Sequence, residues 1–379
     1  MSQKLTDFLE QYLKKSSLFK NKKALQHNYT PHNVPYRGEQ INTLAAILAP
    51  SQRTEKPSNV FIYRKTGTGK TLVARHVATK LLEIAQQNKI NLKILYLNCK
   101  LKRIADTEYR LIAQLSRDLG HTIPATGLPT GEVYKLFLST LDKERAILII
   151  ILDEIDQLVN KIGDEILYNL TRINAELTQS EVCFIGISND LTFIDNVDAR
   201  VKSSLNEEEL IFPPYNAIQL QKILRQRAKL AFPDNTLGEG VIEKCAAYAA
   251  REHGDARRAL ELLRVAAELA ERKNEPTIDA KYIDQAEEKI ERDRVVENII
   301  TQPKQFKLTL YSIITSCNGG GKGIFTGDVY NLYQDHCKKA GVKPLTQRRL
   351  GDIIGELDML GIINARVISK GRHGRMREI

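Results

Sequence analysis

Tryptophan is absent from this 379-residue sequence, and aromatic residues make up only 6% of it. Long apolar runs are also missing: the longest, residues 146–152, is far shorter than the roughly 20 residues that a membrane-spanning helix needs. The N-terminal residues are polar and lack the apolar core of a signal peptide. We therefore expect a cytoplasmic protein with no membrane partner. An apolar fraction of 42% is still enough to fill the cores of more than one domain.

Cysteine is sparse and scattered along the chain. There is no C-x-x-C pair, which argues against a zinc site and favours reduced thiols in a cytoplasm. The five residues are Cys99, Cys183, Cys245, Cys317 and Cys337.

Positive charge is unevenly distributed. The net charge is +10, and residues 301–379 contain 13 Lys/Arg against 6 Asp/Glu, whereas residues 1–300 contain 43 against 40. A basic terminal domain beside a nearly neutral body suggests a polyanionic partner, most often nucleic acid. A solvated basic surface without a partner is the alternative that charge alone leaves open.

The order of predicted elements changes twice along the chain. Residues 1–214 contain apolar strands that alternate with helices, which predicts an α/β domain with a parallel sheet covered on both faces. Residues 215–298 contain helical segments and no strand signal, so we expect a separate helical lid. Residues 299–379 predict three helices followed by two short strands, which is the order of a winged helix-turn-helix domain.

A phosphate-binding loop is predicted between an apolar strand, residues 59–63, and a helix that begins near Lys70. In this turn Gly67 and Gly69 let backbone N–H groups approach a β-phosphate at the helix N-terminus, where the helix dipole favours anions. Lys70 can reach the β- and γ-phosphates, and the hydroxyl of Thr71 can bind Mg²⁺. The predicted contacts with ATP or ADP are Lys65, Thr66, Gly67, Thr68, Gly69, Lys70 and Thr71.

The loop departs from the pattern G-x-x-x-x-G-K-[ST] at its first position, where Arg64 replaces glycine. If that position needs a positive φ, arginine is strained there. If it does not, nucleotide can still bind tightly, but the rates at which it binds and dissociates would be altered.

A second segment supplies the other half of a nucleotide site. Residues 147–152 are all apolar and predict a buried strand that ends in Asp153 and Glu154. Asp153 would hold the Mg²⁺ shell, and Glu154 would orient or deprotonate the attacking water. A later strand ends before Asn189, whose amide could contact the γ-phosphate or that water, although an Asn in a turn is the plain alternative. Together with the loop, this segment argues against an unrelated glycine-rich hairpin.

In the helical lid, Asp255 is expected to cap a helix whose first turn carries Arg257 and Arg258. Adjacent helical residues point about 100° apart, so only one of the two arginines can face the nucleotide. We predict that Arg257 contacts the γ-phosphate and that Arg258 is solvated. Tyr215 and Arg227 could pack against adenosine, although both would also pass as ordinary packing and surface residues.

Arg200 follows the Asn189 strand on the flank opposite the phosphate loop. From there it cannot reach its own nucleotide, but it could act in trans as an arginine finger on a neighbour's nucleotide. A plain surface arginine is the alternative.

The third helix of the C-terminal domain begins with residues that suit base recognition. Arginine can bond guanine bidentately, and Gln can pair with adenine. The wing has glycine corners and closely spaced cations that suit phosphates or the minor groove. A winged helix can instead dock proteins, but here both helix and wing are basic. The predicted DNA contacts are Thr346, Gln347, Arg348, Arg349, Lys370, Arg372 and Arg375.

Taken together, these motifs resemble one family, the archaeal replication initiators of the AAA+ class, relatives of the eukaryotic origin-recognition large subunit and its loading partner. The resemblance covers essentially the whole chain. It rests on residues 59–71, on Ile-Leu-Asp-Glu-Ile-Asp, Gly-Ile-Ser-Asn-Asp, Arg-Val-Lys-Ser-Ser-Leu and Gly-Asp-Ala-Arg-Arg-Ala-Leu, and on the winged domain.

The resemblance implies roles that spacing alone does not. It makes Asn189 a sensor-1 residue and Arg257 a sensor-2 residue, and it places Tyr215 and Arg227 in nucleotide contacts. Residues 98–119 look like the helical insertion that touches DNA in this family. The DNA contacts expected there are Lys102 and Arg103.

The resemblance also implies binding to duplex DNA at chromosomal origins, a place on the nucleoid, slow ATP hydrolysis as a switch, and loading of the replicative helicase. The arginine at position 64 suggests a divergent paralogue that works beside another initiator. Two other functions stay open. One is a DNA-binding regulator whose structural nucleotide site never cycles, which Arg64 favours. The other is an AAA+ clamp-loader or remodelling subunit, which the basic winged domain weakens.

Overall fold

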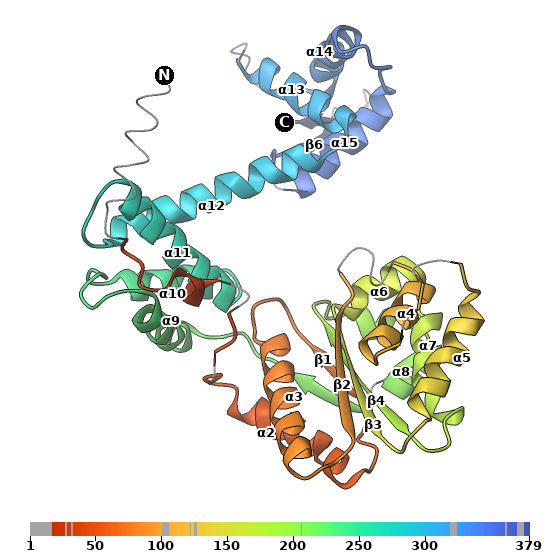
Figure 1. Cartoon of the computed structure of the whole chain (residues 1–379). Coiled ribbons are helices and arrows are strands. Elements are labelled where there is room, and N and C mark those ends of the chain that lie inside the picture. The colour runs from red at the N-terminus through yellow and green to blue at the C-terminus, as the bar shows by residue number, and fades with distance from the viewer. Residues whose placement is uncertain are drawn as a thin grey trace, which may run out of the picture. The chain divides into compact units, whose positions relative to one another are not determined.

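The computed structural model describes residues 17–26, 29–31, 33–100, 106–121, 123–124, 127–205, 207–318, 324–360, 362–369 and 375–379. The chain divides into two compact units, Met1–Ile283 and Asp284–Ile379 (Figure 1). Among the described helices, none combines the length and apolarity that crossing a bilayer requires.

The larger unit is built on a five-stranded parallel sheet with the strand order β2-β3-β4-β1-β5 (Figure 1). This confirms the predicted α/β architecture. One strand was not predicted, because β5 is four residues long, begins with two glutamates and is mostly exposed. The strands are β1 (Val60–Tyr63), β2 (Leu92–Asn98), β3 (Ile147–Asp153), β4 (Glu181–Ser188) and β5 (Glu208–Ile211).

The two faces of the sheet are covered by different helices, and the central strand β3 shows why its sequence is apolar throughout. Leu148, Ile150 and Leu152 pack into one hydrophobic cluster, and Ile149 and Ile151 pack into the other. Alternate side chains of a strand point to opposite faces, so a strand buried on both faces cannot alternate with polar residues.

One cluster contains residues of α2 (Gly38–Leu48) and α3 (Lys70–Gln87), which cover one face. Five helices contribute to the other cluster (Figure 1). Two of these helices are short and follow β3 directly, and glycine at position 163 separates them. The five helices are α4 (Glu108–Asp118), α5 (Thr130–Leu141), α6 (Ile155–Ile162), α7 (Glu165–Thr171) and α8 (Ala199–Leu205). The larger unit also contains the 3₁₀ turns η1 (Lys22–Leu25), η2 (Ala49–Arg53), η3 (Ile173–Ala175) and η4 (Phe193–Asn196).

The lid consists of helices, as predicted. Its first helix starts with a capping box in which the Asn216 side chain accepts from the backbone of Gln219, whose own side chain bonds back to Asn216. An N-terminal segment also packs on the lid: Lys20 and Asn21 both donate backbone N–H groups to the carbonyl of Ala231. The lid helices are α9 (Ala217–Ala231), α10 (Val241–Arg251) and α11 (Ala256–Arg272), whereas α12 (Ala280–Thr301) begins in the larger unit and continues into the smaller one.

The smaller unit has the predicted winged-helix order of three helices and an antiparallel strand pair. Its core is centred on Tyr333, which is fully buried, and on apolar residues of the third helix. The elements are α13 (Lys304–Asn318), α14 (Thr326–Lys339), α15 (Gln347–Met359), β6 (Arg366–Ser369) and β7 (Arg375–Glu378).

Candidate nucleotide-binding site

The phosphate-binding loop joins β1 to α3, and two of its glycines have left-handed backbone conformations. The φ angles are +72° at Gly67 and +92° at Gly69, a region that glycine enters without strain. A Cβ on Gly67 would lie only 1.7 Å from Oδ1 of Asp255 in the lid. Gly67 is therefore required both by the turn and by the close approach of the lid.

Arg64 stands at the first position of the loop without backbone strain. It is not among the non-glycine residues with positive φ, and its backbone N–H donates to the carbonyl of Ser188 on the neighbouring strand β4, with 3.4 Å between N and O. The replacement of glycine therefore leaves the loop geometry intact, which decides between the two alternatives that the sequence left open.

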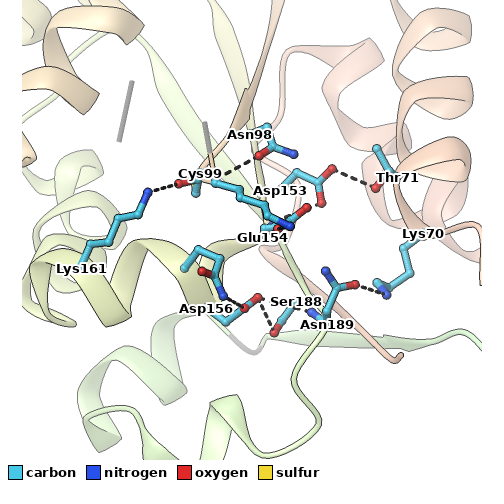
Figure 2. Close-up of polar contacts among 12 residues, drawn as sticks. Lys70, Thr71, Asn98, Cys99, Asp153, Glu154, Asp156, Lys161, Ser188 and Asn189 are labelled. Carbon is cyan, nitrogen blue, oxygen red and sulfur yellow. Dashed lines mark hydrogen bonds and ion pairs between the residues drawn. The ribbon is translucent and has the colours of Figure 1, made fainter. Parts of the chain in front are cut away.

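Figure 2 shows Lys70 at the edge of a polar cluster, with its ammonium facing Asn189. Its ammonium donates to Oδ1 of Asn189 and to the carbonyl of Lys65, each at 2.9 Å, and also to the carbonyl of Arg64. Burial lowers the pKa of Lys70 to about 8, and the negative charge of Asp153 opposes this effect. The loop, the start of α3 and the end of β4 thus meet at one ammonium group.

Thr71 and Asp153 bring together the two halves predicted from sequence. The Thr71 hydroxyl donates to Oδ2 of Asp153 at 2.9 Å (Figure 2). The hydroxyl of Tyr96 on β2 donates to the same oxygen at 2.6 Å. The backbone N–H of Glu154 donates to Oδ1 of Asp153 at 3.0 Å. Hydroxyl and carboxylate oxygens are ligands that Mg²⁺ prefers, so this pair fits the predicted metal position.

Glu154 follows β3 in a left-handed conformation, with a φ of +57°. Such a backbone is uncommon for a residue with a long side chain and often occurs at functional sites. The carboxylate lies 3.8 Å from the ammonium of Lys100, at the end of the adjacent strand β2.

Asp156 contributes to the site although it was not predicted. Its Oδ1 accepts from the hydroxyl of Ser188 at 3.0 Å and from the backbone N–H of Asn189 at 3.4 Å (Figure 2). It therefore fixes the end of β4, where Asn189 faces Lys70. The only signal in the sequence was a carboxylate two residues after Glu154.

A cavity of about 400 Å³ lies between the base and the lid, within the range typical of small-molecule sites. The loop glycines and Thr71 line one end, and Tyr215, Arg227 and Arg257 line the lid side. The structure thus places three of the predicted phosphate residues and both predicted adenosine residues around one space. The other predicted loop residues are not among those that line it; they are Lys65, Thr66, Thr68 and Lys70.

The sequence did not predict that the N-terminal segment forms a wall of this cavity. Tyr29 lines it, and its carbonyl accepts from Nη2 of Arg227 at 3.2 Å while its ring lies 4.4 Å from the guanidinium carbon. The described residues 29–31 and 33–35 include two prolines and no helix, so no periodic pattern marked this part of the segment.

The start of α11 touches the phosphate loop. Asp255 is the predicted N-cap and accepts from the backbone N–H groups of Arg257, at 2.7 Å, and Arg258, at 3.3 Å. The N–H of Ala256 donates to the carbonyl of Gly67 at 3.2 Å. The prediction that Arg258 is solvated is wrong: its side chain is 12% exposed and pairs with Glu252 at 3.2 Å. Burial against α10 explains the difference.

Arg200 does not line the cavity. Its Nε and Nη2 donate to the two carboxylate oxygens of Asp198, each at 3.0 Å, and its guanidinium carbon lies 4.7 Å from the centre of the Tyr168 ring. Asp198 and Tyr168 thus hold the proposed finger at the surface, where 67% of the side chain is exposed.

In the winged-helix unit, the predicted helix residues lie exposed at the start of α15. Thr346 caps the helix by accepting from the N–H of Arg349 at 3.4 Å. The Arg349 guanidinium lies 3.6 Å from both Asp352 and Glu356, two acidic residues on the same helix. Lys370, Arg372, Lys102, Arg103 and the side chain of Arg375 lie outside the described residues.

These features define the class of the protein. A phosphate loop, an Asp-Glu strand end, a polar residue on the adjacent strand and an arginine at the start of a lid helix form an AAA+ nucleotide-binding module, here joined to a winged helix. Matching family models are the ATPase family associated with various cellular activities over residues 60–213, the Cdc6 AAA+ ATPase-type lid domain over 221–288 and the CDC6 C-terminal winged helix domain over 297–379.

Similarity to known proteins identifies the family. The ORC1-type DNA replication protein 1 of Methanosarcina mazei is 52% identical over 100% of this chain and 91% of its own length, and the ORC1-type DNA replication protein of Pyrococcus furiosus is 51% identical over 99% and 90%. The structure of the Aeropyrum pernix ORC1 protein in complex with DNA matches with a TM-score of 0.82 and 45% identity, covering 96% of this chain and 94% of that one. The chain belongs to the ORC1-type DNA replication protein family.

Proposed function

We propose that the chain is an ATP-switched replication initiator that binds duplex DNA at origins. The observation that carries this proposal is the meeting of Lys70, Thr71, Asp153 and Asn189 at one edge of the sheet, below a lid that supplies Arg257. Lys70 and the loop N–H groups would hold the β- and γ-phosphates.

Thr71 and Asp153 would hold Mg²⁺, which supplies positive charge to the phosphates when bound. Glu154 would orient the attacking water or accept its proton, and Asn189 would position that water or the γ-phosphate. Tyr215 and Arg227 line the cavity and would contact adenosine.

The proposed DNA contacts are in two regions. In the winged helix, the exposed start of α15 would enter the major groove and the wing would contact phosphates. Support comes from the basic charge of residues 301–379 and from a relative, 45% identical, that was solved in complex with DNA. A second contact is proposed through the insertion. The residues concerned are Thr346, Gln347, Arg348, Arg349, Lys370, Arg372 and Arg375, with Lys102 and Arg103 in the insertion.

Partners follow from the same proposal. Arg200 would complete the site of a neighbouring subunit, such as a paralogous initiator, and the assembled complex would load the replicative helicase. The exposed position of Arg200 beside Asp198 supports a role in trans.

Two substitutions test the nucleotide site and its use. Calorimetry should show that Lys70→Ala abolishes ADP and ATP binding; undiminished affinity would refute the assignment. Glu154→Gln should retain ATP binding, prolong the ATP state and change the assembly on DNA. If Glu154→Gln changes neither, the alternative of a DNA-binding regulator with a non-cycling site is favoured instead.

The insertion is tested in the full-length chain. The double variant Lys102→Ala, Arg103→Ala should bind DNA more weakly. It should also protect a shorter stretch of DNA in footprinting on the genome that encodes the protein. The control is the Lys93→Ala variant, which removes an exposed cation at the start of β2, away from the insertion. Unchanged affinity and footprint in the double variant would confine DNA contact to the winged helix.

A further inference from the structure

Arg37, the residue before α2, is buried where the phosphate loop meets the lid linker. Only 2% of its surface is exposed. Its Nε donates to the carbonyl of Thr68 in the loop at 2.9 Å, and its Nη2 donates to the carbonyl of Pro213 in the linker at 2.6 Å. One guanidinium therefore joins two segments that are 145 residues apart in sequence.

The aromatic residues of the linker pack on the same guanidinium. Its carbon lies 3.9 Å from the centre of the Tyr215 ring and 5.6 Å from that of Phe212. The Tyr215 backbone N–H donates to the carbonyl of Gly254 at 3.3 Å, directly before α11. A chain of contacts thus runs from the phosphate loop through Arg37 and Tyr215 to the lid helix that carries Arg257.

Arg37 is a buried cation that pairs with no carboxylate among the described residues; its partners are carbonyl oxygens and aromatic faces. A buried charge without a counter-ion is unfavourable, even when its hydrogen bonds are satisfied. Its Nε bonds the Thr68 carbonyl and lies 3.8 Å from the point where a Cβ on Gly69 would be, so the guanidinium packs against the loop that would hold the phosphate groups. Their negative charge would stabilise the buried guanidinium.

We propose that Arg37 is a positioning residue that makes the arrangement of the lid depend on whether phosphate fills the loop. The inference rests on the proposed nucleotide binding. With phosphate bound, the loop holds the Thr68 carbonyl in one position and the phosphate charge balances the charge of Arg37. Arg37 then keeps its contacts with Pro213 and Tyr215. Without phosphate, no negative charge balances the Arg37 guanidinium, which favours its hydration and that of the linker. The lid then occupies a wider range of positions relative to the base.

The experiment measures the distance between the base and the lid in the whole chain. Spin labels are attached to cysteines introduced at Gln87 on α3 and Lys229 on α9, both exposed, in a Cys317→Ser background because Cys317 is also exposed. Distance distributions are recorded without ligand, with ADP and with pyrophosphate, and calorimetry gives the affinity for each. The variants are Arg37→Gln and Arg37→Lys.

In the unsubstituted background, both ADP and pyrophosphate should narrow the distance distribution, since both fill the loop. Arg37→Gln should bind ADP about 5-fold or more weakly and keep a broad distribution at saturating ADP. Arg37→Lys keeps the charge but cannot reach the carbonyls of both Thr68 and Pro213. ADP should therefore narrow the distance distribution of this variant only in part. Arg251→Gln, which removes an arginine from the Tyr248 ring elsewhere in the lid, should behave as the background does.

Three outcomes have distinct meanings. If the background binds no ADP, the proposed nucleotide function is wrong. If it binds ADP and pyrophosphate but the distribution does not narrow with pyrophosphate, the inference is overturned without any need for a folded Arg37 variant. The inference would also be overturned if ADP narrowed the distance distribution of a folded Arg37→Gln protein as much as that of the background.

Discussion

The guanidinium carbon of Arg75 lies 3.8 Å from the centre of the Tyr96 ring. Arg75 is one turn after Thr71 on α3 and lines the cavity, and the hydroxyl of Tyr96 bonds Asp153. The helix that starts at the phosphate loop thus holds a tyrosine of the neighbouring strand in position, and that tyrosine holds the carboxylate proposed to bind Mg²⁺.

Tyr96→Phe removes the hydroxyl but keeps the ring beneath Arg75. We expect the Mg²⁺ concentration for half-maximal ATP binding to rise about 10-fold, because outer hydrogen bonds orient metal-binding carboxylates. ADP binding in the presence of a chelator should stay unchanged. Tyr63→Phe is the matched control, since Tyr63 donates its hydroxyl to Glu209 at the surface at 2.9 Å. Equal Mg²⁺ requirements in both variants would show that Tyr96 does not orient the site.

The lowered pKa of Lys70 predicts a pH-dependent nucleotide affinity. Burial sets its pKa at about 8 in the ligand-free protein, whereas bound phosphate favours the charged form and raises the pKa. Above about pH 8, binding must therefore take up a proton, and affinity falls by up to about tenfold per pH unit. Calorimetry of ADP in chelator, in buffers of different ionisation enthalpy, measures this uptake. Lys70→Arg should bind with no such uptake, and a flat affinity from about pH 7 to about pH 9.5 in the natural protein would contradict the prediction.

Arg200 should act on a neighbour and not on its own site. Arg200→Ala is expected to leave ADP affinity unchanged and to lower the protein-concentration-dependent part of ATP hydrolysis at least about tenfold. Mixing Arg200→Ala with Lys70→Ala should restore part of the activity, because the second variant still presents Arg200 to the intact site of the first. A fast ATPase in dilute monomer, or no recovery on mixing, would argue against a finger in trans.

The two arginines of α15 should differ in their contribution to DNA binding. Arg349 faces Asp352 and Glu356, and it would have to leave them to reach a base, whereas no ion pair of Arg348 is found within the described residues. Arg348→Ala should therefore cost about 1–3 kcal/mol on a specific site, and Arg349→Ala should cost less. Glu356→Gln should strengthen binding. Fluorescence anisotropy over a salt series gives these values, and each lost phosphate contact should change the log–log slope by about 0.9. A larger loss for Arg349→Ala would reverse the assignment.

The sequence predicted the elements whose local pattern is strong. The apolar run of β3 can be stable only inside a sheet, and the spacing of Gly67, Gly69 and Lys70 is specific to a phosphate loop. The prediction failed where tertiary packing decides. The strand β5 pairs with β1 despite its two glutamates, and Arg258 is buried and pairs with Glu252, the residue that follows α10.

The walls of the cavity were the least predictable part. Tyr29 lies in a segment without helical or strand periodicity, and it reaches the site only because residues 17–25 are bonded to the lid. Asp156 and Arg37 act through backbone groups of distant segments, as acceptor from Asn189 and donor to Thr68. Such contacts leave no spacing in the sequence by which to recognise them.

The ordinary φ of Arg64 has a consequence for recognising related chains. Backbone geometry does not exclude larger side chains at the first loop position, so this position is free to diverge while the loop keeps its shape. Gly67 and Gly69 have no such freedom, since both combine a positive φ with close neighbours from the lid and its linker. A search that demands the first glycine would discard chains like this one, whereas one anchored on Gly67, Gly69 and Lys70 would retain them.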